Sequence, residues 1–300
     1  MSVSALPSVV IPVRNGAATV SATLRSLEHQ IGAPDGIEIL VVDNGSDDDT
    51  AEIVRAHDVT LLQEQKRGAA AARNRGIRCA RGEVVLCLDA DMLPTRTWLS
   101  NMLAPFTDDE TVLVAGQTVC YRPETAADRY VQTAGLFDVE VNVRHPLLPC
   151  APSGNMAVRR AAALAIGGFD ESFHQAEDVD FCVRLARSLP HEIMYQPAAV
   201  AFHRFLGTDD RLREEAWRYG EGSAALYRRY PEVLPWGQRQ TFRVIVGQAA
   251  RTLKPEWLRL GRYVGLVESD RLEFERYHRL WTWWYWRGFA HRFRHDPRMR

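Results

Sequence analysis

Strand and helix signals alternate over the first hundred residues, and this alternation constrains the fold more than any other feature of the chain. Short apolar runs that suit strands lie at 8–13, 37–42, 59–62 and 84–88. Segments with helical spacing lie between them, at 19–30, 50–56 and 68–80. Such alternation implies right-handed crossovers, and so a mostly parallel sheet with helices on both faces. The sequence therefore predicts an α/β fold.

The pattern loosens after Thr95. We expect helices at 98–106, 159–166 and 179–188, and strands at 112–115, 193–195 and 199–202. The proline-containing stretch 122–152 predicts a long, partly irregular connection, and such connections are often functional. From Asp209 onward the signals are mostly helical. We therefore predict an α/β domain over 1–205 and a helical C-terminal extension over 206–300.

Composition excludes several classes of protein. Apolar residues make up 46% of the chain and charged residues 25%, which is ordinary for a folded soluble protein. The formal net charge of -1 argues against a surface built to bind nucleic acid. No signal peptide or bilayer-spanning run is evident, so we expect a cytoplasmic protein. The cysteines are odd in number and lack C-x-x-C spacing, as expected of buried thiols: Cys79, Cys87, Cys120, Cys150 and Cys182.

The C-terminal segment 276–300 is strongly basic and aromatic. It holds seven arginines against one acid, and four of the eight tryptophans of the chain lie within six of its residues. Three interpretations stay open. The segment packs as a final helix on the catalytic domain or on a second subunit, it binds a polyanionic or lipid-linked acceptor, or it makes peripheral contact with the inner face of a membrane.

Polar residues follow the predicted parallel strands where each strand ends. Because carboxyl ends of parallel strands share one edge of the sheet, these groups should lie together, where open α/β folds bind ligands. Carboxylates there suit a base N–H or a divalent cation, and arginines at a helix start suit phosphate. The groups are Pro12, Arg14 and Asn15; Asp43; Arg67, Gly68 and Arg73; and Asp89, Ala90 and Asp91.

Taken in order, six segments resemble family 2 glycosyltransferases of the GT-A fold. The segments are 10–15 (VIPVRN), 41–46 (VVDNGS), 68–74 (GAAAARN), 89–91 (DAD), 167–171 (GGFDE) and 177–180 (EDVD). The match covers roughly 7–205, whereas 206–300 carries no family motif that we can place. The resemblance implies a nucleotide-diphospho-sugar transferase fold with a mostly parallel central sheet flanked by helices, and an enzyme that transfers a sugar with inversion.

The resemblance also implies roles on the donor side. Asp43 matches the carboxylate that contacts the nucleobase, and the segment Pro12–Asn15 with Arg14 matches the wall of the base pocket. Arg67, Gly68 and Arg73 match the stretch that faces ribose and phosphates. One departure is Asn44, which stands where many members have a second Asp, and it weakens the inference of nucleobase preference.

Further roles concern the metal and the transfer step. Asp89 with Ala90 matches the ribose-side acid and its neighbour, Asp91 matches the ligand of a Mn²⁺ or Mg²⁺ ion, and His203 matches a third-site histidine near metal or diphosphate. Asp178, in the pair Glu177–Asp178, matches the catalytic base of inverting members. Ser153, Gly154 and Asn155 match a wall near the donor sugar or the acceptor.

Alternatives remain at this stage. Glu177 and Asp178 could simply open a helix, where its dipole favours acids, and His203 could pack structurally beside two phenylalanines.

The preferred function is metal-dependent transfer from a nucleotide-diphosphate sugar, with UDP as the expected nucleotide, to a hydroxyl of a glycan, a lipid-linked molecule or a small molecule. Its rivals are a nucleotidyltransferase and a non-catalytic nucleotide-sugar-binding or scaffold protein of a membrane assembly. The sequence leaves the sugar, the acceptor, the pathway and the oligomeric state open.

Overall fold

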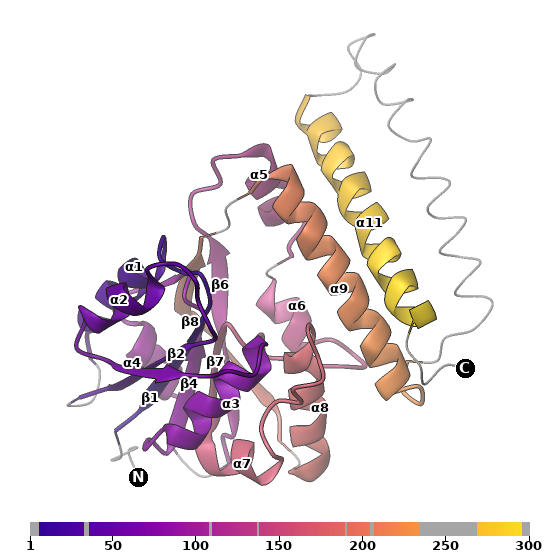
Figure 1. The fold of residues 1–300 in the computed structure, drawn as a ribbon. Helices are drawn as coiled ribbons and strands as arrows, with labels where there is room; N and C mark the ends of the chain where they lie inside the picture. Colours follow the sequence, from indigo (N-terminus) through magenta and orange to yellow (C-terminus); the bar gives the residue numbers. More distant parts are fainter. Residues whose placement is uncertain are drawn as a thin grey trace. The chain divides into compact units, whose positions relative to one another are not determined.

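The structure is a computed structural model of the chain. It describes residues 6–32, 36–107, 110–136, 138–189, 191–204, 207–234 and 269–295. The chain divides into two compact units (Figure 1). The first comprises Met1–Tyr121 and Phe137–Arg204, and the second comprises Arg122–Leu136 and Phe205–Arg300. We describe each unit by itself.

The first unit is built around one sheet of eight strands in the order β3-β2-β1-β4-β7-β6-β8-β5. The strands are β1 (Ser8–Val13), β2 (Glu38–Asp43), β3 (Thr60–Gln63), β4 (Val84–Leu88), β5 (Met92–Pro94), β6 (Leu113–Cys120), β7 (Asn155–Arg159) and β8 (Ile193–His203). β3, β2, β1 and β4 pair in parallel, as the alternating signals predict. Every residue of β4 is buried, as expected of a strand covered on both faces.

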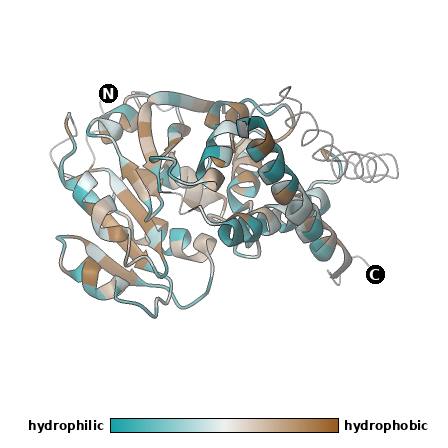
Figure 2. Ribbon diagram, turned by 90° about the horizontal axis from the view of Figure 1, so that it is seen from above, coloured by the Kyte–Doolittle hydropathy of each residue, from teal (hydrophilic) through white to brown (hydrophobic). Residues whose placement is uncertain are grey.

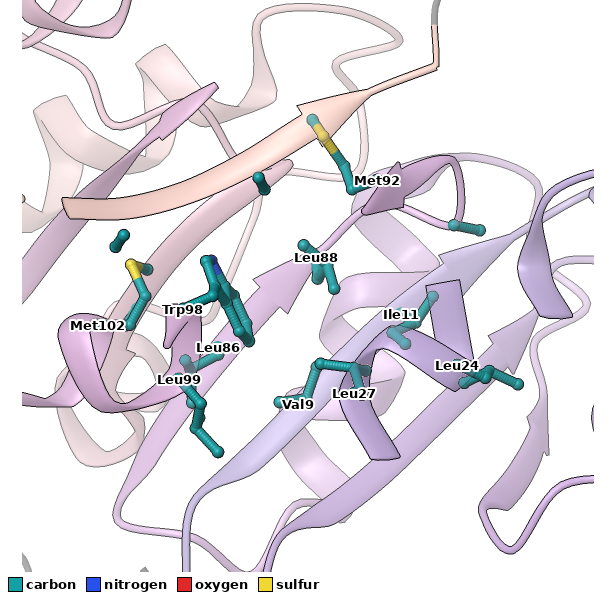
Figure 3. Close-up of a cluster of buried hydrophobic side chains, with 14 of the residues drawn as sticks. Val9, Ile11, Leu24, Leu27, Leu86, Leu88, Met92, Trp98, Leu99 and Met102 are labelled. Carbon is teal, nitrogen blue, oxygen red and sulfur yellow. The ribbon is translucent and has the colours of Figure 1, made fainter. Parts of the chain in front are cut away.

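Helices cover both faces of this sheet. α1 (Val20–Glu28), α2 (Thr50–Arg55) and α4 (Trp98–Leu103) pack on one face through Leu24, Val54 and Trp98 (Figure 3). The other face carries α3 (Ala69–Cys79), α6 (Val139–Val143), α7 (Arg160–Ala165) and α8 (Glu177–Ser188). Figure 2 shows strands coloured mostly as hydrophobic and helices in which hydrophobic and hydrophilic residues are mixed. The α/β fold predicted from the sequence is confirmed.

One close approach sets the position of α3. A side chain at Gly76 would overlap Val10 of β1, so only glycine lets α3 lie this near the sheet. The helix carries Arg73 and Asn74 on the same buried side. The tight packing therefore buries these two polar side chains between α3 and the neighbouring segments, where Arg73 reaches Asp89 and Asn74 reaches Phe169.

The second half of the sheet differs from the sequence prediction. β7 is inserted antiparallel between β4 and β6, and β5 pairs antiparallel with β8. We did not predict β5 or β7, because both depend on pairing with strands far away in the sequence. The two strands predicted at 193–195 and 199–202 are one strand, β8, with a register shift opposite Gly116 and Gln117. The stretch 122–152 is more regular than predicted, since it contains α5 (Ala126–Thr133) and α6.

The second unit is helical in its described part. α9 (Asp209–Arg229) and α11 (Ser269–His295) run side by side in the same direction, with the Tyr277 hydroxyl bonded to Asp209 near the start of both helices. Glycines let them meet closely, because a side chain at Gly220 would overlap the Tyr285 backbone and one at Gly288 would overlap the Trp217 backbone. The described part of the basic and aromatic segment is thus a helix packed on α9.

Two further findings bear on the sequence-based expectations. In the described residues no helix is both long enough and apolar enough to cross a bilayer. The five cysteines are free thiols, and all but Cys79 are buried. Residues 235–268 of the predicted extension, and 296–300 of its basic segment, lie outside the described residues.

Candidate active site

The carboxyl ends of β1 and β2 form the first part of the site. Asp43 ends β2 opposite Val13, and it is 3% exposed. Its Oδ1 accepts hydrogen bonds from the backbone N–H and the hydroxyl of Ser46, at 2.9 and 2.6 Å, and its Oδ2 accepts one from Gln63 at 3.1 Å. These three donors fix the carboxylate in one orientation. Sequence reasoning assigned no function to Ser46, although it lies in the 41–46 segment, and it missed Gln63, which no motif marks.

Asn44 holds the loop between β3 and α3. Its Nδ2 donates to the carbonyl oxygens of Glu64 and Lys66, at 3.0 and 2.7 Å, and its Oδ1 accepts the Gly68 N–H at 2.8 Å. Only an amide can donate and accept in this way, whereas an ionised Asp could only accept. The departure from the family pattern at this position therefore has a structural role.

The other donor-side residues lie at the same edge but are more open. Arg14 is exposed, and Arg67 is exposed while its guanidinium donates to the carbonyl oxygens of Asn44 and Gly45. Asn15, in a left-handed conformation that Asn tolerates, accepts the Asp47 N–H. Pro12 lies within β1, paired with β2. Their predicted contacts with base and phosphate stay predictions.

Arg73 is not an exposed cation at a helix start. Its guanidinium is 4% exposed, and it donates to Asp89 Oδ1 at 2.7 Å and to Glu177 Oε1 at 2.8 Å. Asp89 follows β4, whereas Glu177 begins α8. A single buried side chain thus joins the two acidic segments that the sequence indicated. The phosphate contact predicted for Arg73 stays a prediction.

The segment Ser153–Asn155 contacts both Asp89 and Asp178. The Ser153 N–H donates to Asp178 Oδ2 at 3.3 Å, and the Gly154 carbonyl accepts the Asp89 N–H at 3.2 Å. A Cβ at Gly154 would come 2.5 Å from Asp89 Oδ2, so glycine is required there. Asn155 accepts the indole N–H of Trp98 at 2.7 Å and is 1% exposed, which anchors the start of β7.

Asp178 is the most perturbed acid of the site. Its pKa is raised to about 6, because desolvation and the neighbouring charge of Glu177 together outweigh the charge of Arg73 and two backbone N–H donors. The residue before the pair, Ala176, has a left-handed backbone with a φ of 66°, which is unusual for a residue other than glycine. This conformation starts α8, so Glu177 and Asp178 lie in its first turn.

Asn74 fixes the loop that precedes α8. Its Nδ2 donates to the Phe169 carbonyl and to Glu171 Oε1, both at 2.9 Å, and its Oδ1 accepts the Phe169 N–H at 2.8 Å. Lys66 reaches Glu171 at 2.6 Å from the β3–α3 loop. The Gly-Gly-Phe-Asp-Glu segment therefore has a positioning function, and the adjacent residues Arg73 and Asn74 fasten it and α8 to α3.

Asp91 and His203 form a separate pair. The antiparallel pairing of β5 with β8 sets Met92 opposite His203, and His203 Nε2 lies 3.3 Å from Asp91 Oδ2. In the described residues no group of three or more His, Cys, Asp or Glu side chains could hold a metal ion. The Asp91 side chain is 40% exposed and so open to a cation, and the role of the pair in holding Mn²⁺ or Mg²⁺ stays a prediction.

Comparison with known proteins identifies the family. The family model described as glycosyl transferase family 2 matches residues 8–167. These residues include the parallel strands β1 to β4 and the Ser153–Asn155 segment. The chain belongs to glycosyl transferase family 2. Among curated members of this family, the pre-mycofactocin glycosyltransferase of Mycobacterium tuberculosis is 33% identical over 75% of the chain. The match spans 48% of that relative, so the chain covers about half its length.

A further relative and two solved structures are also similar to this chain. The glycosyltransferase AglE of Haloferax volcanii is 28% identical, with 75% of each chain covered. A mannosyltransferase from Pyrobaculum calidifontis, solved with GDP-mannose and Mn²⁺, has a TM-score of 0.66 at 22% identity, covering 98% of this chain and 88% of its own. Glucosyl-3-phosphoglycerate synthase from Mycobacterium tuberculosis, solved with Mg²⁺ and UDP, has a TM-score of 0.56 at 21% identity, covering 75% and 79%. The fold is therefore the predicted GT-A type.

Proposed function

We propose that this family 2 member is a metal-dependent, inverting glycosyltransferase that moves a sugar from a UDP-linked donor to a hydroxyl acceptor. One observation carries the proposal. The segment Ser153–Gly154 bonds to the donor-side acid Asp89 and to Asp178, an acid with a raised pKa, so donor and base sides meet along one backbone segment. Inverting transfer needs such a pair of sites on either side of one anomeric carbon.

Asp178 serves as the base in this proposal. Its ionised carboxylate takes the proton of the acceptor hydroxyl as the oxygen attacks the anomeric carbon, and the bond from that carbon to the diphosphate breaks. A base with a pKa near 6 is ionised at neutral pH and is stronger than an ordinary aspartate, which suits general-base catalysis. The Ser153 and Val179 N–H groups hold its two oxygens, at 3.3 and 2.8 Å.

The donor binds along the parallel-strand edge. Asp43, held by Ser46 and Gln63, recognises the nucleobase, and Asp89 recognises the ribose. Arg14 and Arg67 remain exposed at this edge, where their positive charge favours an anionic donor. Ser153, Gly154 and Asn155 form the wall beside the sugar. Relatives solved with UDP and with GDP-mannose support a nucleotide-sugar donor in general.

Asp91 and His203 are the residues that would hold the metal ion. Their 3.3 Å approach and the exposure of Asp91 support this assignment. A divalent cation bound there supplies neutralisation of charge on the leaving diphosphate. We place the enzyme in the cytoplasm, and contact of 276–300 with a membrane stays a proposal. The acceptor classes named above all remain compatible with the site.

Two rivals are disfavoured by particular observations. A nucleotidyltransferase needs a glycine-rich, cationic first loop for triphosphate, whereas residues 14–17 bond to the β2–α2 loop, with the Ala17 N–H donating to Asp48 at 3.1 Å. A non-catalytic binding protein has no need of a carboxyl whose pKa is raised to about 6 beside the donor edge.

The deciding experiment is a panel of nucleotides and nucleotide sugars, scored by thermal stabilisation with and without Mn²⁺ or Mg²⁺. UDP should stabilise the protein only when the metal is present, and one UDP-sugar should be consumed when acceptors are added. Stabilisation by nucleoside triphosphates in preference to diphosphates would favour the nucleotidyltransferase. Stabilisation by a UDP-sugar that is not consumed with any acceptor would favour the non-catalytic binding protein.

A further inference from the structure

Arg73 joins two segments that are 88 residues apart along the chain. Its two terminal nitrogens donate to Asp89 Oδ1 and Glu177 Oε1, and the guanidinium lies 5.8 Å from the centre of the Phe169 ring. Asp89 belongs to the donor edge, and Glu177 is adjacent to the base Asp178. The side chain is 4% exposed, so water screens neither ion pair well.

This geometry distinguishes Arg73 from a surface cation that binds phosphate. Both terminal nitrogens are already occupied by carboxylates, each in a charge-assisted hydrogen bond of under 2.9 Å. A planar guanidinium can hold two carboxylates at fixed angles, whereas a lysine ammonium is a point charge on a flexible stem. The residue is therefore suited to fixing the distance between two protein segments.

Three charged or titratable groups act on Asp178. Glu177, on the same helix, raises its pKa, and Arg73, on α3, lowers it. Cys150, on the connection packed beside α8, is a neutral thiol, because a hydrogen bond with Cys182 and burial raise its pKa well above the usual value. Arg73 thus supplies a positive charge that opposes that of Glu177 at Asp178.

We propose that Arg73 is a positioning residue for the transfer reaction, tying the donor-side acid Asp89 to the first turn of α8 through Glu177 and so keeping the base ionised and aligned. The inference rests on the proposed role of Asp178 as base. Arg73 need not touch either substrate. Its loss should alter the base before it alters donor binding.

The test compares Arg73→Gln, Arg73→Lys and Glu177→Gln with Arg78→Gln, an exposed arginine on the same helix. The pH dependence of kcat/KM is measured for each protein, together with the titration of the Asp178 carboxyl by ¹³C NMR without substrates. The Asp178 signal is assigned by its loss in Asp178→Asn.

Arg73→Gln should move the acid limb and the carboxyl titration to higher pH by about one pH unit. Glu177→Gln should move the acid limb and the carboxyl titration to lower pH. Arg73→Lys should raise them less than Arg73→Gln does, and Arg78→Gln should leave the profile unchanged.

Opposite shifts are the result that a merely structural role cannot give. If Arg73→Gln and Glu177→Gln move the limb in the same direction, or if neither moves it, the proposal is wrong. If Arg73→Gln does not fold, Arg73→Lys decides, because it keeps the positive charge but cannot hold both carboxylates as a planar guanidinium does. An Asp178 titration and kcat/KM unchanged in Arg73→Lys would then contradict the proposal. A carboxyl that shifts in the NMR titration while the kinetic limb stays fixed would reject Asp178 as the base and leave the ion-pair function of Arg73 standing.

Discussion

Ser153 and Asp178 are joined by one hydrogen bond, in which the Ser153 backbone N–H donates to Asp178 Oδ2 over 3.3 Å. The bond ties the base to the segment that also contacts Asp89 through Gly154. A backbone donor cannot be removed by a side-chain substitution. The backbone directly before β7 therefore aligns the base with the donor edge, and the side chains around Asp178 adjust the charge of Asp178.

The acid limb of the pH–rate profile, where kcat/KM rises with pH, should report the ionisation of Asp178. Its pKa is raised to about 6, mainly by desolvation, so kcat/KM should rise with pH through about 6 and level off above it. A pH–rate profile from pH 4.5 to 8 checks this expectation. A limb near pH 4 would mean that the base is an ordinary, solvated carboxylate.

Asp178→Asn should abolish transfer and leave donor binding intact, because the amide cannot accept the hydroxyl proton. The same change should stabilise the protein. The folded-state pKa lies above the usual value of 3.8, so the folded protein loses stability as pH rises from about 4 to about 6. The Tm of the variant should exceed that of the wild type above pH 6, and the difference should vanish below pH 4. Equal Tm values at every pH would show that Asp178 is not buried as an unfavourable charge.

Asp91→Asn and His203→Ala should each weaken the metal dependence of donor binding. Asp91 and His203 are the only two side chains that we assign to the metal, so loss of either leaves one protein ligand. Isothermal titration with UDP, with and without Mn²⁺, measures the effect. UDP affinity in either variant that responds to Mn²⁺ as in the wild type would contradict the assignment.

Asn44→Asp should damage the loop before α3. An aspartate places a carboxylate against the carbonyl oxygens of Glu64 and Lys66, and loss of the buried donor costs about 1–3 kcal/mol of unfolding free energy. UDP binding should weaken too, because Arg67 and Gly68 lie on this loop. The matched control is Gln132→Glu, the same change at an exposed position, which should alter neither Tm nor affinity. An unchanged Tm in Asn44→Asp would show that the amide clamp is dispensable.

Ala176→Gly should raise stability, because glycine adopts a positive φ without steric cost. A gain approaching about 1 kcal/mol would raise Tm by roughly 2–4 °C. The control is Ala161→Gly, an exposed position within α7, where the same change should lower stability by about 0.5–1 kcal/mol. Differential scanning fluorimetry separates the two signs, and a lower Tm in both variants would show that the left-handed turn is not strained.

Much of the fold could be predicted from the sequence, because its first half obeys local rules. β1 and β4 have the predicted bounds, and the helix starts of α2 and α3 lie within one residue of the prediction. The unpredicted elements depend on tertiary pairing. β7 takes its place only between β4 and β6, and β5, with three residues, exists through its ladder with β8.

The sequence indicated which polar residues follow the strands and begin α8, but not the contacts among them, and the functional roles of these residues stay predictions. The motifs placed Asp89, Asp91 and Asp178 at one region, but no spacing rule indicates that a helix residue such as Arg73 would reach both Asp89 and Glu177. Asn44 was noticed only as a departure from a pattern. Its function depends on carbonyl groups 20 and 22 residues away, which a sequence motif does not represent.

The glycine contacts between α9 and α11 have a consequence for handling the protein in the laboratory. Deleting 276–300 would uncover the backbone of α9 at Trp217 and Gly220, so the shortened chain could aggregate or stick to vesicles for reasons unrelated to the native protein. Point substitution is the cleaner way to ask whether this segment meets a membrane. Trp283, which is 52% exposed and on the outside of the helix pair, is the residue to change first.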